Sequence, residues 1–262
     1  CAQYIGQQNQ ERANESARQV LFIITLISIV VSAICLGFKK PLLRLIFGSV
    51  EADVMRASEI YFFYTALSFP FIALYDAAAS IFRAQDNTQG PITISMISNI
   101  MNIVGNASRS WGFHMGVAGA AIATLISRIF CALVVLIQLR RDRQPIVVRD
   151  YLKIRPDWPM IGRILGIGIP SGVENSMFQL GKIIVLSLVS TFGTYAIAAN
   201  AVSNTLASFQ VLPGMAIALA VTTVIARCVG AGDYEQVKYY TRKLILITHG
   251  ALVITNVVIV VA

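Results

Sequence analysis

Charged residues are scarce in this chain of 262 residues. They make up 13% of it, whereas a soluble domain carries about a quarter. Hydrophobic residues make up 56%, and the mean hydropathy is +0.70. This balance excludes a soluble globular protein and predicts an all-α integral membrane protein, a polytopic helix bundle. The net charge of +8 would suit a nucleic-acid partner, but the distribution of the basic residues argues against one.

Histidine and cysteine are also rare. The two histidines, His114 and His249, are isolated, and no HExxH motif or other catalytic constellation accompanies an apolar stretch. We therefore expect no enzyme, no catalytic residue and no cofactor. The cysteines show neither CxxC nor metal-ligand spacing, which excludes a disulfide or zinc framework. They are Cys1, Cys35, Cys131 and Cys228.

The sequence contains several long apolar stretches. About 20 residues cross the hydrocarbon core of a bilayer, and the chain contains seven candidate spans. Residues 183–226 carry no charge over a length too great for one span, so we expect a hairpin at residues 192–194, around Gly193. Residues 39–56 form a short outer segment with an interfacial helix, because Pro41 suits a helix start. The spans are 20–38, 57–82, 91–108, 117–139, 164–192, 194–226 and 244–262.

Basic residues concentrate on one side of these spans. The opposite segments, 39–56 and 109–115, hold 5 Lys or Arg. The other set holds 14 and comprises 1–19, 83–90, 138–163 and 227–243. The positive-inside rule predicts that this second set is cytoplasmic. We expect a multi-pass protein of the plasma (inner) membrane.

The two ends of the chain resemble each other. Ala2–Gln19 aligns without gaps on Ala226–Lys243 at an offset of 224 residues, and Gly6 and Gly230 are one of the identical pairs. An apolar run without charge follows both copies. Membrane transporters are commonly built from duplicated helix bundles, so the repeat favours a transporter.

The repeat and a central basic segment predict the domain organisation. We expect a partial N-terminal lobe at residues 1–139, a basic cytoplasmic linker at 140–163 and a partial C-terminal lobe at 164–262. The chain begins inside a polar segment and ends in an apolar run, so we expect further helices at both ends.

Polar residues recur at helical spacing on three predicted spans. In hydrocarbon each such group needs a partner or water. Interhelical hydrogen bonding explains any single Asn, whereas a shared polar cavity better explains three polar faces on neighbouring spans. One span also carries two columns of small residues (116, 120 and 124; 119, 123 and 127), which we interpret as packing surfaces only. The polar faces comprise Ser95, Asn99, Asn102 and Asn106; Asn200, Asn204 and Ser208; and Ser171, Asn175 and Lys182 with Glu174 and Gln179 adjacent.

Glu174 and Lys182 are charges near the middle of a predicted span. Each would cost roughly 2.5–3.5 kcal/mol near the bilayer centre, so facing lipid is disfavoured. They lie about 12 Å apart along a helix, too far for a direct ion pair. Each therefore needs a partner on another helix, water, a bound ion or a substrate, and a structural role stays open for both. Asp76 is close to Arg83 and the inner surface, so a water-accessible helix end explains it equally well.

Several segments carry a family resemblance. They are RAQDNTQGP at 83–91, the Asn-rich span that follows, GVAGAAIATLISR at 116–128, GIPSGVENSMFQLG at 168–181 and AIAANAVSN at 196–204. On these motifs the chain resembles the multidrug and toxic compound extrusion (MATE) family, closest to its DNA-damage-inducible-F-like branch. The match covers essentially the whole chain. It implies a twelve-helix fold of two lobes, of which this chain holds helices three to six and seven to nine.

The resemblance implies a secondary antiporter. Such a protein exports cationic or amphipathic small molecules (drugs, toxins or metabolites) in exchange for H⁺ or Na⁺ by alternating access. We expect a small-molecule substrate, a lipid bilayer, no nucleic acid and a monomer, with any Na⁺ near Glu174. The predicted substrate and cation cavity comprises Glu174, Asn175, Gln179, Lys182, Asn200, Asn204, Asn99, Asn102 and Asp76.

The chain departs from the family pattern in two places. The first helix, which carries a coupling carboxylate in many members of this branch, lies outside the chain. In another branch the seventh helix has its cation-binding acid about one turn after the position of Glu174, where this chain has Phe178. Glu174 therefore does not simply inherit that role.

Other functions stay open. A lipid-linked oligosaccharide flippase of the same superfamily would need several basic residues in its cavity, and this chain offers Lys182 and Arg128. An intramembrane enzyme, a receptor or a purely structural membrane protein is disfavoured, because none of them accounts for the repeat.

Overall fold

The computed structural model describes residues 1–47, 52–112, 116–141, 146–148 and 156–261. This part of the chain is all-α and contains no strand. Within the predicted basic linker at 140–163, residues 142–145 and 149–155 lie outside the described residues. The helices are α1 (Ala2–Gly6), α2 (Gln10–Gly37), α3 (Lys39–Phe47), α4 (Ala52–Ala84), α5 (Gln89–Gly112), α6 (Gly116–Leu139), α7 (Trp158–Ser190), α8 (Thr194–Gly230) and α9 (Tyr234–Val261).

The long helices coincide with the seven predicted spans, and five of them are long and apolar enough to cross a membrane. The other two, α5 and α7, carry the Asn column and the pair Glu174 and Lys182. The helices are longer than the apolar stretches, because helical hydrogen bonding continues beyond the edge of the hydrocarbon. The segments long and apolar enough to cross a membrane, by length and composition, are Gln10–Gly37, Asp53–Ala84, Ala118–Leu139, Tyr195–Gly230 and Tyr234–Ile259.

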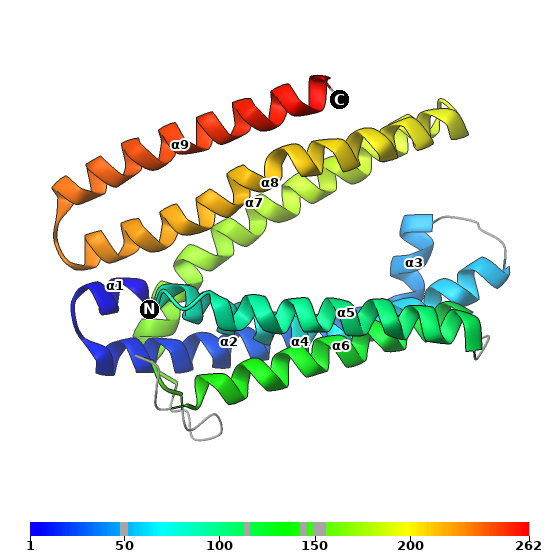
Figure 1. Cartoon of the computed structure of the whole chain (residues 1–262). Helices are drawn as coiled ribbons and strands as arrows, with labels where there is room; N and C mark the ends of the chain where they lie inside the picture. Colours follow the sequence, from blue (N-terminus) through cyan, green and yellow to red (C-terminus); the bar gives the residue numbers. More distant parts are fainter. Residues whose placement is uncertain (48–51, 113–115, 142–145, 149–155, 262) are drawn as a thin grey trace. The chain divides into compact units, whose positions relative to one another are not determined.

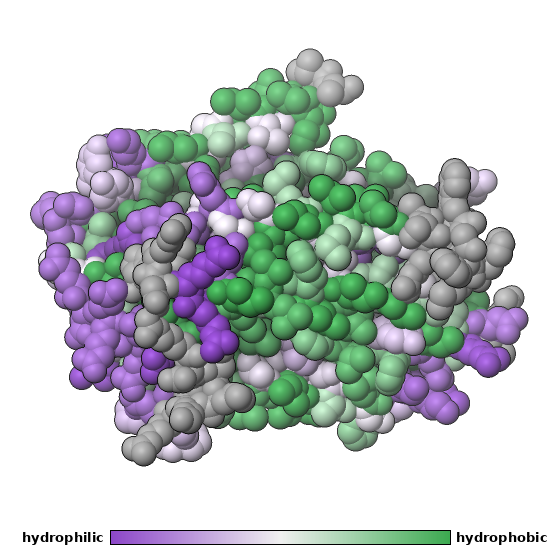
Figure 2. All heavy atoms as spheres, turned by 60° about the horizontal axis from the view of Figure 1, so that its bottom comes forward, coloured by the Kyte–Doolittle hydropathy of each residue, from purple (hydrophilic) through white to green (hydrophobic). Residues whose placement is uncertain are grey.

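Large apolar side chains cover the outside of the helices. Ile103 on α5 is 67% exposed, and Leu133 on α6 is 54% exposed. On the face drawn in Figure 2, hydrophobic residues occupy the middle and hydrophilic residues gather toward both ends. Hydrocarbon is the solvent that suits such a surface, and the polar ends suit the headgroup regions. The protein is an integral membrane protein.

The helices fall into two compact units (Figure 1), each described here by itself. Unit 1 comprises Cys1 and Gln10–Asp157, and its central helix α4 packs against α2 and α6, while α6 also packs against α5. Small residues make these approaches possible. Ala66 and Ala78 on α4 are fully buried. A Cβ added to Gly105 on α5 would lie 3.1 Å from the Cβ of Ala123 on α6.

Residues 146–148, which follow α6, are held within unit 1 by burial and by hydrogen bonds. Ile146 and Val148 are fully buried. The backbone N–H of Ile146 donates to Oε1 of Gln85 at 3.1 Å, and that of Val147 donates to Oδ1 of Asn14 at 3.1 Å. Buried backbone donors need such partners, so side chains from α2 and from the turn after α4 hold this segment in place.

Unit 2 comprises Ala2–Asn9 and Trp158–Ala262. In it α8 packs against α9, α1 and α7. The hairpin predicted between two spans is confirmed, because α7 ends at Ser190 and α8 begins at Thr194. Gly193 between them has a φ of 96°, a backbone conformation that favours glycine.

The sequence repeat is confirmed as a structural repeat. The helices α2 and α9 begin and end at positions that differ by the same 224 residues. Gln8 (φ 56°) and Gly232 (φ 74°), which are equivalent in the repeat, both adopt the left-handed conformation. The two turns make equivalent backbone hydrogen bonds, from Gln7 to Gln3, Gln8 to Ile5 and Asn9 to Tyr4 in one copy, and from Ala231 to Arg227, Gly232 to Val229 and Asp233 to Cys228 in the other.

The two copies touch through their glycines within unit 2. A Cβ added to Gly6 would lie 2.2 Å from the carbonyl oxygen of Arg227, and one added to Gly230 would lie 2.1 Å from that of Gln3. Gln3 and Arg227 are equivalent in the repeat, so each copy presents its glycine to the same carbonyl of the other. This is the reciprocal pattern of a two-fold contact. Backbones approach this closely only where no side chain intervenes.

We expect Gly230→Ala to destabilise the full-length protein by about 1–3 kcal/mol, because the added methyl group meets backbone that cannot move aside alone. Gly162→Ala is the matched control, since a Cβ there has no neighbour within 4 Å. That change should be neutral or slightly stabilising, because Ala favours a helix more than Gly does. Thermal unfolding in detergent measures both, and equal melting temperatures for the two variants would contradict the contact.

Candidate functional site

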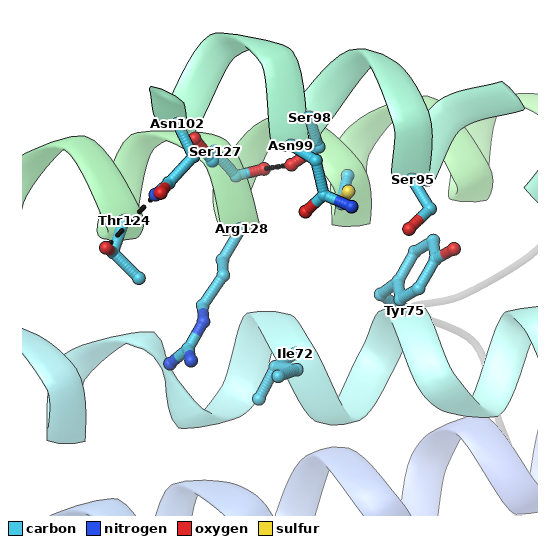
Figure 3. A pocket seen from close by; sticks show the side chains of 10 residues that line it. Ile72, Tyr75, Ser95, Ser98, Asn99, Asn102, Thr124, Ser127 and Arg128 are labelled. Atoms are coloured by element: carbon cyan, nitrogen blue, oxygen red, sulfur yellow. Dashed lines mark hydrogen bonds between the residues drawn. The ribbon is translucent and has the colours of Figure 1, made fainter. Parts of the chain in front are cut away.

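A cavity of about 310 Å³ lies between α4, α5 and α6 of unit 1 (Figure 3). Its lining is mainly polar and uncharged, with one cation. Asn99 and Asn102, predicted from the sequence as cavity residues, both line it, whereas Asp76 does not. The lining residues are Ile72, Tyr75, Ser95, Ser98, Asn99, Asn102, Thr124, Ser127, Arg128 and Cys131.

The helical spacing of the Asn column on α5 determines which amides meet α6 and which meet the cavity. Nδ2 of Asn102 donates to Oγ1 of Thr124 on α6 at 3.1 Å, and Nδ2 of Asn106 donates to Oδ1 of Asn102 at 3.0 Å. Asn99 makes no hydrogen bond to a described residue, and its side chain projects from α5 toward α4 in Figure 3. One face of α5 therefore combines a structural amide, Asn102, with a free one, Asn99.

Arg128 is the charged group among these lining residues, and it lies at the middle of α6. Its Nη1 donates to Oγ of Ser68 on α4, and Ser68 in turn donates to the carbonyl oxygen of Thr65 at 2.6 Å. The sequence prediction missed this residue as a site. The signal was the same as for Glu174 and Lys182, a charge in the middle of an apolar span.

Thr124 and Ser127 were also missed. They belong to the columns of small residues on α6, for which only packing was predicted. The packing itself is present, since Ala123 and Ser127 are buried and Oγ of Ser98 donates to the carbonyl oxygen of Ser127 at 3.1 Å. One residue of each column, Thr124 or Ser127, also lines the cavity, because α6 turns one edge of its packing face toward the space beside α4.

Asp76 lies on α4 toward the end that carries Arg83. Its backbone carbonyl accepts a hydrogen bond from Oγ of Ser80 at 2.8 Å, and Ser80 accepts one from Nη2 of Arg83 at 2.6 Å. The residue is exposed. This environment fits a water-accessible helix end, the alternative that the sequence had left open.

A second cavity, of about 940 Å³, lies between α7 and α8 of unit 2. It brings together four of the predicted site residues, Gln179, Lys182, Asn200 and Asn204. Nζ of Lys182 lies 4.9 Å from the centroid of the Phe178 ring, within the range of a cation–π interaction. The remaining lining is largely apolar and includes Met177, Phe178, Ile183, Val185 and Leu186.

Glu174 and Asn175 lie on α7 but do not line this cavity. Nδ2 of Asn175 donates to the carbonyl oxygen of Ser171 on its own helix at 2.9 Å. Glu174 is exposed, and its carboxylate has no hydrogen bond or ion pair with a described residue. The structure therefore separates Glu174 from the amides with which it was grouped.

The chemistry available in these cavities is that of binding. Hydroxyls, amides and one cation are among the groups that line each of them, and these groups donate and accept hydrogen bonds. Among the residues that the structure describes, no cluster of three or more His, Cys, Asp or Glu is placed to hold a metal ion.

Comparisons with known proteins agree with a transporter. The MatE family model matches residues 1–107 and 170–262. The "Probable multidrug resistance protein YoeA" of Bacillus subtilis (strain 168) is 29% identical over 248 residues, which are 92% of this chain and 53% of that protein. The "Probable multidrug resistance protein NorM" of Thermotoga maritima is 26% identical over 243 residues, 90% of this chain and 51% of that protein. The chain thus spans about half the length of these relatives.

A solved structure shares the fold. It is described as the outward-facing conformation of a multidrug resistance MATE family transporter of the MOP superfamily. Its TM-score is 0.84 at 19% identity, over 94% of this chain and 54% of that one.

We expect Thr124→Val to lower the stability of the full-length protein by about 0.6 kcal/mol, the average for an interhelical hydrogen bond in a membrane. Valine keeps the shape of threonine and removes the hydroxyl that accepts from Asn102. Thr93→Val is the matched control, because that hydroxyl bonds only the carbonyl oxygen of Gln89 on its own helix. Unfolding in denaturant should show a larger loss for Thr124→Val, and equal losses would contradict a bond between α5 and α6.

Proposed function

Because the chain belongs to the MatE family of multidrug efflux transporters, we propose that it forms about half of a secondary antiporter. The transporter exports cationic or amphipathic small molecules in exchange for H⁺ or Na⁺. The observation that carries this proposal is that each unit contains a cavity with polar side chains in its lining, between helices whose outer faces are apolar. Transporters in general are not enzymes, and the cavities supply binding groups in keeping with that.

The cavity between α7 and α8 supports an amphipathic substrate. Asn200, Asn204 and Gln179 offer hydrogen-bonding groups, while Met177 and Leu186 offer apolar surface. A lining of this kind, mostly apolar with a few placed polar groups, is typical of small-molecule sites. An oligosaccharide flippase gains less support, because it needs several cations and Lys182 is the charged residue among those lining this cavity.

The duplicated architecture supports alternating access. Repeats related by an axis along the membrane normal are a common basis of rocking motions in transporters. The reciprocal contact of Gly6 and Gly230 is a local two-fold relation between the two copies. We propose that a partial N-terminal lobe (1–139) and a partial C-terminal lobe (164–262), joined by the linker at 140–163, move against each other about such an axis.

Glu174 supports coupling to a cation. Its carboxylate lies on α7, which the sequence predicts to span the membrane, without a described partner. An uncompensated charge is costly at that depth, so a proton, Na⁺ or a cationic substrate would be stabilised beside it. Asn175, one residue further along α7, offers an amide oxygen to the same ion.

We also propose a location and an orientation. A monomer in the plasma membrane would place the loops at 83–90, 138–163 and 227–243 in the cytoplasm. The 14 Lys or Arg on that side, counted with residues 1–19, against 5 on the other support this orientation.

The orientation predicts which positions an impermeant thiol reagent reaches from outside. In a cysteine-free background, single cysteines at Thr88, Arg141 and Glu235 should stay unlabelled in intact cells. All three positions are exposed at helix ends or turns. A cysteine at Lys40, also exposed, should label and serves as the control. Labelling of the first three with protection of Lys40 would invert the proposed topology.

Glu174→Gln should abolish or strongly weaken gradient-driven efflux in vesicles. It keeps the shape of the side chain and removes the charge that would hold the coupling cation. Folding should survive, because no described residue loses an ion-pair partner and a costly charge is removed. Glu235→Gln is the control, since that carboxylate pairs with Lys238 at 3.4 Å on the exposed start of α9.

The two roles of Glu174 predict different outcomes. If Glu174 instead pairs with a cation on another helix, its loss should destabilise the protein by about 3–5 kcal/mol. A stable variant with undiminished efflux would refute the coupling role.

A further inference from the structure

We propose that the cavity between α4, α5 and α6 binds the anionic group of a small molecule, a carboxylate, sulfonate or phosphate, through the guanidinium of Arg128. This inference deepens the proposed function by naming a chemical feature of the substrate. It rests on that function only for the claim that the bound molecule is transported.

The first reason is the charge of Arg128 and its depth. The residue lies at the middle of α6, a helix long and apolar enough to span a membrane. A guanidinium there stays ionised and costs several kcal/mol if it faces lipid. Arg128 is half-buried and lines the cavity. Its charge is therefore directed at a space that a ligand can enter.

The second reason is that the described hydrogen-bond partner of Arg128 is a neutral group. The guanidinium carries five N–H donors, and the described acceptor is the hydroxyl of Ser68. A neutral hydroxyl fixes the side chain but does not compensate its charge. No described carboxylate forms an ion pair with Arg128. Donors remain for the oxygens of an anion, and charge-assisted hydrogen bonds of this kind are about twice as strong as neutral ones.

The third reason is the character of the part of the cavity lining that α5 provides. Asn99 and Ser95 on α5 line the same cavity without adding charge. In Figure 3 the side chains of Asn99 and Arg128 both reach from the α5 and α6 side toward α4. The amide of Asn99 is free of described partners and offers two donors to the same anion. A cation would be repelled here, so this cavity and Glu174 in the other unit select for opposite charges.

Asp76 is the alternative partner for Arg128. It lies eight residues beyond Ser68 on α4, which is about 12 Å along the helix. No described ion pair joins the two side chains, although the charges of Arg83 and Arg128 both act on the Asp76 carboxylate. Asp76 is exposed and does not line the cavity. The geometry leaves the guanidinium to a ligand.

The test compares two probes that differ in charge, 1-naphthoate and its neutral amide 1-naphthamide. Calorimetric titration uses the full-length protein in nanodiscs of phosphatidylcholine, without an ion gradient. The acid should bind about tenfold or more tightly than the amide, as charge-assisted bonds imply. Arg128→Gln should remove the difference, and Arg128→Lys should retain most of it. Arg163→Gln, which removes an exposed cation that lines neither cavity, is the matched control and should leave it unchanged.

Several results would overturn the inference. Equal affinity of the two probes for the unaltered protein would do so, whether or not Arg128→Gln folds. So would naphthoate binding that survives Arg128→Gln or that Lys182→Gln alone removes. Naphthoate binding that appears only after Asp76→Asn would show that Asp76 neutralises Arg128. Melting temperatures of the variants separate lost binding from lost folding.

Two further arms identify the source of the anion and the dependence on transport. Adding phosphatidylglycerol to the nanodiscs should leave naphthoate affinity unchanged if a soluble anion is the ligand. Arg128-dependent competition by this lipid would instead identify a lipid headgroup as the source of the same chemistry. Efflux is measured separately in vesicles, so a protein that binds naphthoate but exports nothing refutes the proposed transport and not the site.

Discussion

The absence of water in the hydrocarbon core determines most of this structure. Every backbone N–H and C=O in that region needs a partner within the protein, and helices provide it. Hydroxyls obey the same constraint: Thr25, Thr93 and Thr205 each donate to the carbonyl oxygen four residues earlier. Amides and charged groups are less easily satisfied by their own helix. Several of them gather where helices leave space, which is why both cavities have polar side chains in their lining although the outer surface is apolar.

The contact of Gly6 and Gly230 shows how a sequence repeat becomes a structural relation. Each copy ends a helix with the same three backbone hydrogen bonds and a left-handed residue. Because the two turns are alike, each offers a glycine and a carbonyl oxygen at equivalent places, and the two surfaces complement each other. A side chain at either position would separate the backbones. Duplication thus provides a self-complementary contact without a second evolved surface.

The sequence predicted the membrane class, the long helices, the hairpin at Gly193 and the repeat, because apolar length and turn residues are local properties. It also grouped Asn99 and Asn102 with residues of α7 and α8 in one predicted cavity, and the structure shows these two amides lining a cavity within unit 1. It did not predict Arg128, Thr124 or Ser127 as lining residues. Small residues on a helix indicate close packing, but which edge of that face borders a cavity depends on where the neighbouring helices end their contact. That is a tertiary property, which no spacing along one helix records.

The two cavities differ in how their charged side chains are held. Each has one cation among its lining residues, yet the cations are held differently, Arg128 by a hydroxyl and Lys182 by the ring of Phe178. The family resemblance puts a cation-binding acid of another branch at the position of Phe178. An aromatic face there accepts a cation without neutralising it, so Lys182 keeps its charge available to the cavity. Glu174, one turn earlier, lies outside that lining. The proposed attraction for anions therefore rests on unit 1 and the proposed attraction for cations on unit 2.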